Sequence, residues 1–125
     1  MQSVLIIFLG AGIGGVFRHL LNAWTSRIVG TEFPWGILGI NILGSLAMGA
    51  VIAWLASRDF SQPQLALFLT TGILGGFTTF SAFSLDVALL YERGEILQGA
   101  AYAAASVVFS VLALIIGMWM VKSLS

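Results

Sequence analysis

Cysteine is absent from this 125-residue sequence, and charged residues are scarce. Without cysteine, the chain cannot form disulfides or thiolate metal sites. Five basic and five acidic residues make up only 8% of the chain, whereas a soluble domain typically carries about 25% charged residues. So little charge cannot cover a water-exposed surface, and a neutral chain offers no basic stripe to a phosphate backbone. We therefore exclude a soluble domain and a nucleic-acid partner.

Long apolar runs occupy most of the chain, in which 59% of the residues are hydrophobic. A membrane-spanning helix needs about 20 predominantly apolar residues, and strands with open edges cannot cross a bilayer. The runs predict four spans, at about residues 4–27, 33–57, 65–91 and 96–121. The expected fold is therefore an all-α membrane protein, with a single four-helix transmembrane domain over residues 1–125 and the lipid bilayer around it.

The few charges between the spans are divided evenly between the two sides of the membrane. Four spans with short loops place Arg58 and Lys122 on one side, and Arg27 and Arg93 on the other. Because Lys and Arg near helix ends normally collect on the cytoplasmic side, this balance predicts insertion in both orientations. Two copies would then form an antiparallel dual-topology homodimer. The alternative is a weakly biased protein that the insertion machinery fixes in one orientation.

The segment GGFTTFS, residues 75–81, lies near the middle of the third apolar run. Paired glycines weaken a helix, and the neighbouring threonines are stiff at χ1. A break of the third helix here would release backbone carbonyls at mid-membrane depth, which is tolerated only where protein, water or an ion satisfies them. Such carbonyls could bind a small cation. A continuous helix with a glycine packing face is the alternative interpretation.

Polar side chains inside the second and fourth runs are candidates for binding an ion. Tyr102, Ser106 and Ser110 are spaced by four residues, so they form one stripe on a helix. A hydroxyl stripe offers donors to an anion without a fixed charge, and the amide of Asn41 could donate in the same way. The alternative is that these groups form hydrogen bonds with neighbouring helices or with their own backbone.

Two phenylalanines and two charged residues complete the candidates. Phe80 and Phe83 follow the suspected break, and their ring edges carry the positive part of the aromatic quadrupole. Arg18 lies deep within a span, which implies a watery vestibule or a partner. Asp86 is near the end of the third run and is expected to reach the membrane surface. The sequence contains no Ser–His–Asp set, metal-ligand spacing or phosphate loop, so we do not expect an enzyme.

These residues also make the sequence similar to a known family. GGFTTFSAFS, residues 75–84, resembles the third-helix signature of the Fluc (CrcB) family of fluoride channels. The likeness extends over the whole chain and includes GGVFR at residues 14–18, PWGILGINILGS at residues 34–45 and the Tyr-Ser-Ser stripe. One departure is Ala82, which stands where the family usually has threonine.

The resemblance implies a passive fluoride channel in the bacterial inner membrane, built as an antiparallel homodimer with two pores. It also implies export of fluoride from the cytoplasm and a structural sodium ion at the dimer centre, bound by the carbonyls of Gly75 and Thr78. By the same resemblance, Arg18 lies near an aqueous vestibule. The residues implied for the fluoride pathway are Asn41, Phe80, Ser81, Phe83, Ser84, Tyr102, Ser106 and Ser110.

Two other functions fit four spans with short loops. A small multidrug exporter also has four helices and dual topology, but its proton exchange needs an acidic residue in the first span. The first span here has none, because Glu32 lies in a loop. The second alternative is a non-transporting subunit of a larger membrane assembly, held by glycine faces such as Gly10 and Gly14.

Overall fold

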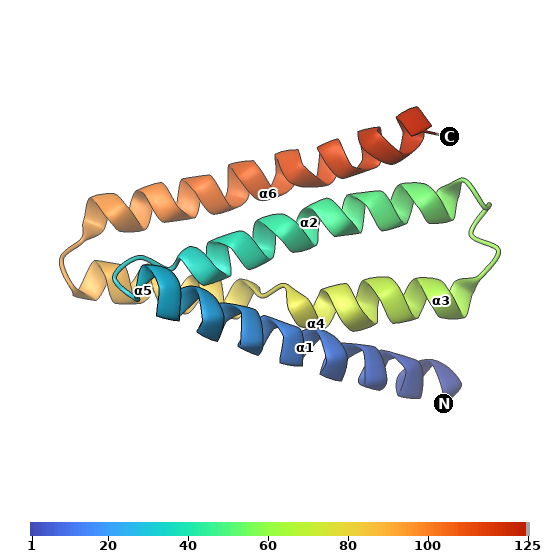
Figure 1. Ribbon diagram of the computed structural model, residues 1–125, viewed down its shortest axis with the longest axis horizontal. Helices are drawn as coiled ribbons and strands as arrows, with labels where there is room; N and C mark the ends of the chain where they lie inside the picture. Colours follow the sequence, from blue (N-terminus) through green and yellow to red (C-terminus); the bar gives the residue numbers. More distant parts are fainter. Residues whose placement is uncertain (125) are drawn as a thin grey trace.

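The computed structural model describes residues 1–124, and Figure 1 shows their arrangement. Within this part of the chain there are helices and no strands. The four segments that are long and apolar enough to cross a membrane are Gln2–Val29, Trp35–Ala56, Pro63–Glu92 and Ile96–Leu124. The predicted all-α fold, with four helical segments long and apolar enough to span a membrane, is confirmed for residues 1–124.

The chain reverses direction from one span to the next (Figure 1). In chain order the helices are α1 (Gln2–Val29), α2 (Trp35–Ala56), α3 (Pro63–Leu67), the π-helix η1 (Phe68–Leu74), α4 (Gly75–Phe77), α5 (Phe80–Glu92) and α6 (Ile96–Leu124). The third span therefore consists of α3, η1, α4 and α5. Because each reversal is short, α2 and α6 run in the same direction, and they pack side by side.

Glycines let the spans approach one another closely. A Cβ atom at Gly10 would lie 2.9 Å from the Cα of Gly72, and one at Gly76 would lie 2.9 Å from the Cα of Ala11. A Cβ atom at Gly49 of α2 would lie 3.0 Å from a backbone nitrogen of α6. The expected small-residue faces are therefore present between α1 and the third span and between α2 and α6, where they allow backbones to touch.

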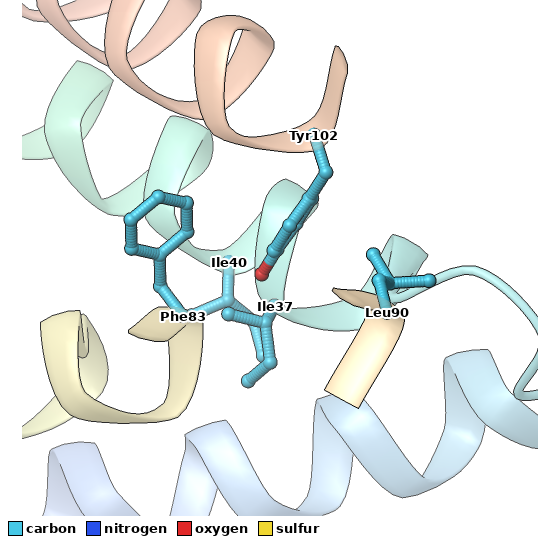
Figure 2. Packing of buried hydrophobic residues seen from close by; sticks show 5 residues of the cluster. All are labelled: Ile37, Ile40, Phe83, Leu90 and Tyr102. Carbon is cyan, nitrogen blue, oxygen red and sulfur yellow. The ribbon is translucent and has the colours of Figure 1, made fainter. Parts of the chain in front are cut away.

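Buried side chains gather at one end of the bundle, where α2, α5 and α6 meet. Many large apolar side chains elsewhere point outward, such as Phe8 and Leu97, which are 72% and 83% exposed, although Leu55 and Leu74 are buried. In a bilayer, lipid covers such side chains at no cost, so the fold depends less on a large core than a soluble fold would. Figure 2 shows the buried cluster, which consists of Ile37, Ile40, Phe83, Leu90 and Tyr102.

The backbone of the third span becomes extended at Thr78 and Thr79. Their φ and ψ angles are −81° and 157°, and −153° and 121°, whereas α4 and α5 on either side are helical. The sequence pattern placed a possible break within residues 75–81, which contain two glycines and two threonines, and within that segment Gly75 and Gly76 are helical. The β-branched threonines take the extended geometry instead, since their stiff χ1 suits it. Thr79 then caps α5 by accepting a hydrogen bond from the Ala82 N–H.

Candidate functional site

Asn41 of α2 holds the extended residue Thr79 by two hydrogen bonds. The Asn41 Nδ2 donates to the Thr79 carbonyl at 3.0 Å, and the Thr79 N–H donates to Asn41 Oδ1 at 2.8 Å. The side-chain amide thus replaces the partners that the Thr79 backbone would have in a continuous helix. An extended residue can persist inside a membrane only if its backbone groups are satisfied in this way.

The carbonyls of Gly75 and Thr78 lose their usual helical donors at the same place. In a continuous helix they would accept from the N–H groups four residues later. The Thr79 N–H donates to Asn41 instead, and the Ala82 N–H donates to Thr79 Oγ1 at 3.1 Å. The Arg18 guanidinium of α1 donates to the Thr78 carbonyl at 3.4 Å. At the interruption, the Thr78 carbonyl thus accepts from Arg18, and the Gly75 carbonyl has lost its helical donor.

A groove of about 410 Å³ lies beside this interruption, between α2, α5 and α6. Its floor includes the extended residues Thr78 and Thr79, and its polar walls come from two different helices. The polar and aromatic side chains along it are Asn41, Ser45, Thr79, Phe80, Phe83, Ser106 and Ser110. The structure thus brings together five of the eight residues predicted for the pathway.

Ser106 and Ser110 place hydroxyl groups in the groove wall that no protein atom satisfies. Ser106 is only 6% exposed, and neither hydroxyl has a hydrogen-bond partner within residues 1–124. Leaving a buried hydroxyl unpaired costs about 1–3 kcal/mol. The alternative that these serines bond to neighbouring helices or to their own backbone is therefore wrong. Two unpaired donors in one groove point to a ligand that binds there.

Phe80 and Phe83 differ in their surroundings although both line the groove. Their ring centroids are 5.4 Å apart at an angle of 49°. Phe83 is 9% exposed and belongs to the buried cluster of Figure 2, whereas Phe80 is 76% exposed. One ring is thus fixed by packing and the other projects outward from the first turn of α5.

Tyr102 points away from the groove, unlike the two serines of its stripe. Its ring is fully buried and packs against Phe83 at 5.3 Å, and its hydroxyl donates to Asp86 at 3.0 Å. Asp86, for which the sequence predicts a place at the membrane surface, is partly buried and accepts this bond from α6. Sequence reasoning missed the pair, and Asp86 also lines a small polar cavity with Asn22 and Ser26.

Ser81 and Ser84 lie on the exposed side of α5, outside the groove. The Ser84 hydroxyl donates back to the Phe80 carbonyl at 3.0 Å. The Ser81 hydroxyl lies 3.4 Å from Thr79 Oγ1. Ala82 is partly buried against the core cluster, so the missing hydroxyl is replaced there by apolar packing.

The fold and the groove define a class of protein: a small multi-pass membrane protein with unpaired hydrogen-bond donors between its spanning helices. In the part of the chain that the structure describes, no group of three or more His, Cys, Asp or Glu side chains could hold a metal ion. Its chemistry is that of hydroxyl and amide donors and backbone carbonyls.

Residues 5–118 match the family model described as CrcB-like protein, Camphor Resistance (CrcB), and the chain belongs to this family. It is 54% identical over 124 residues to the fluoride-specific ion channel FluC of Granulibacter bethesdensis, with 99% of this chain and 98% of that protein covered. It is 52% identical to the protein of the same name from Mesorhizobium japonicum and 43% identical to that from Agrobacterium fabrum. Each of these alignments covers 99% of both chains.

Proposed function

We propose that the protein is a passive, fluoride-selective channel. The unpaired Ser106 and Ser110 hydroxyls carry the proposal from the structural side, because they offer donors to a small anion. The relatives named fluoride-specific ion channels carry it from the side of the sequence, since they match over nearly the full chain. A channel is not an enzyme, and the family membership agrees with that expectation.

In this mechanism, the groove replaces the water shell of fluoride with protein donors. Ser106 and Ser110 donate from α6. Asn41 uses one N–H on Thr79, and an amide nitrogen carries two, so one donor remains for the ion. The ring edges of Phe80 and Phe83 add weak electrostatic stabilisation. With no fixed cation among the groove residues, binding stays weak enough for fast release, as conduction requires.

Asp86 gives Tyr102 a different role from the serines. The Tyr102 hydroxyl has one proton to donate, and it donates that proton in its hydrogen bond to the Asp86 carboxylate. In this arrangement Tyr102 lies outside the groove, and it can donate to fluoride only after its hydroxyl turns away from Asp86. Ser81 and Ser84 stay predictions for the part of the pathway outside the groove.

A structural sodium ion is the second part of the proposal. Backbone carbonyls at unwound helices coordinate sodium in other membrane proteins, and the carbonyls of Gly75 and Thr78 have both lost their helical donors. The two carbonyls offer oxygen ligands to the ion, which would take the place of the Arg18 guanidinium at the Thr78 carbonyl. The ion would supply a fixed positive charge beside the groove. Replacing sodium with a large organic cation should lower the unfolding temperature in detergent. An unchanged unfolding temperature would remove sodium from the account.

An antiparallel dual-topology homodimer is the third part. Phe80 is 76% exposed, and the groove that it lines is open on one side, which a second copy would cover. Gly12 and Gly15 of α1 and Gly39 of α2 have no atom within 4 Å of a would-be Cβ, so small residues also face outward. Because two loop cations lie on each side, we propose that the chain inserts in both orientations in the bacterial inner membrane. The break of the third span would then lie at mid-membrane depth. The channel would export fluoride from the cytoplasm.

Liposomes test the proposed activity. The purified protein is reconstituted, the liposomes are loaded with fluoride, and efflux is recorded with a fluoride electrode while chloride efflux is measured in parallel. We expect fast fluoride efflux and almost no chloride efflux. Equal passage of both anions would contradict a fluoride-selective channel. Proton-coupled movement of cationic drugs would favour the multidrug exporter, and no flux with a copurifying larger partner would favour the assembly subunit.

A further inference from the structure

Ser45 of α2 lines the same groove as Ser106 and Ser110, one helical turn after Asn41. Its side chain is partly buried. No hydrogen bond within residues 1–124 occupies its hydroxyl. The resemblance to fluoride channels implies no role for this residue.

Other hydroxyls in the spanning helices are satisfied in a different way. Thr25, Thr70 and Ser84 donate to the carbonyl four residues earlier, at 2.8, 2.7 and 3.0 Å. This bond is the usual way to satisfy a hydroxyl inside an apolar helix. The Ser45 hydroxyl does not make it, and neither do the two serines across the groove. A hydroxyl that faces a groove without an intrahelical partner is free to bind whatever enters.

The packing of α2 on α6 determines which turn of α6 lies beside Ser45. The helices run in the same direction, and a Cβ at Gly49 would lie 3.0 Å from the Met118 backbone nitrogen. Ser45, one turn before Gly49, is therefore level with the turn of α6 that follows Ser110. On that turn, Leu114 lines the groove and offers no donor.

We propose that Ser45 is a further anion-binding residue, which extends the donor row by one turn beyond Ser110 from the opposite wall of the groove. An anion that leaves Ser110 on this side meets Ser45 before it reaches the apolar lining of Met48 and Leu114. The step is about 5–6 Å along the helix axis. This inference rests on the proposed fluoride conduction.

The test compares Ser45→Ala and Ser45→Cys, which lose a strong donor, with Ser45→Thr, which keeps it. Ser45→Cys nearly conserves the side-chain volume. Ser57→Ala is the control, because Ser57 is the exposed residue that caps the C-terminus of α2, and its hydroxyl donates to the Trp54 carbonyl. Initial fluoride efflux from liposomes is measured over a range of fluoride concentrations, together with the unfolding temperature in detergent.

We expect Ser45→Ala and Ser45→Cys to raise the half-saturating fluoride concentration about tenfold, as for the loss of one hydrogen bond to a charged group. Ser45→Thr and Ser57→Ala should stay within about twofold of the unmodified chain. The unfolding temperatures should not change. Equal half-saturation in all variants, or an equal rise in Ser45→Ala and Ser45→Thr, would overturn the role of Ser45 alone. No fluoride efflux from the unmodified chain would overturn the proposed function itself.

Discussion

The two halves of the third span differ in how closely they pack against the neighbouring helices. Before Thr78, η1 and α4 pack on α1 so closely that Gly10 and Gly76 have no room for a Cβ atom. After Thr79, α5 leaves α1 and packs on α6, beside a groove in which Ser106 and Ser110 are unpaired. The first half is closed and contributes stability. The second half leaves the hydroxyls of Ser106 and Ser110 unpaired, which costs stability and, in the proposed function, provides a binding place for fluoride.

The largest expected effect is on the closed half. A Cβ atom at Gly14 would lie 2.8 Å from the Phe77 backbone nitrogen, whereas one at Gly12 meets nothing within 4 Å. Gly14→Ala should lower the free energy of unfolding by about 3 kcal/mol or abolish folding, because the backbones must separate. Gly12→Ala, the matched control, should be neutral or slightly stabilising, since alanine favours the helix. Unfolding followed by tryptophan fluorescence in detergent measures both. Equal stability of the two variants would show that α1 does not need the close approach.

The junction of the two halves should be the next most sensitive place. Asn41→Ala leaves both backbone groups of Thr79 without a partner. We expect a loss of about 2–3 kcal/mol in stability and of more than tenfold in fluoride efflux. Thr25→Val, which removes a hydrogen bond inside one helix, serves as the control and should change little. Normal efflux from Asn41→Ala would mean that the interruption does not depend on this amide.

A smaller effect is expected at the buried end of the open half. Tyr102→Phe keeps the ring but removes the donor to Asp86. We expect a loss of about 1–2 kcal/mol in stability, because a partly buried carboxylate loses a hydrogen bond. Asp86→Asn should cost less, and a double-mutant cycle by thermal unfolding measures their coupling. Additive single effects would show that the Tyr102–Asp86 bond contributes nothing to the fold.

The smallest effect on stability is expected at Ser106 in the groove wall, where the change should appear in fluoride efflux instead. Ser106→Ala removes a buried hydroxyl that has no partner. Stability should be unchanged or rise by up to about 1 kcal/mol, while fluoride efflux falls about tenfold. Leu112→Ala on the exposed side of α6 is the control for efflux, and it should conduct normally. A destabilised Ser106→Ala variant with unchanged efflux would reverse the distinction between the two halves.

The fold was largely predictable from the sequence, because four apolar runs and few charges leave little choice. The glycine faces at Gly10 and Gly72 were predictable for the same kind of reason, since small residues at a spacing of four mark close helix contacts. The π-helix from Phe68 to Leu74 was not expected, because in the sequence these residues form part of a continuous apolar run. The axial offset between neighbouring helices could not be predicted from the sequence either, and the position of the groove depends on that offset.

The candidate site was predictable in its residue types and less so in their partners. Spacing alone put Tyr102, Ser106 and Ser110 on one stripe. It could not show that the Tyr102 hydroxyl turns to Asp86, since that depends on how α5 and α6 meet after their turn. Nor could spacing show that the Asn41 amide forms two hydrogen bonds with the Thr79 backbone, because the two residues are far apart in the sequence.

The most direct test of the central claim is fluoride efflux from liposomes that contain either the unmodified chain or the double variant Ser106→Ala, Ser110→Ala, with both proteins shown to be equally stable. We predict fast, fluoride-selective efflux from the unmodified chain and a loss of about a hundredfold in the double variant, roughly tenfold for each lost donor. Equal efflux from the two would contradict conduction along the groove, and the absence of fluoride efflux from both would contradict a fluoride channel.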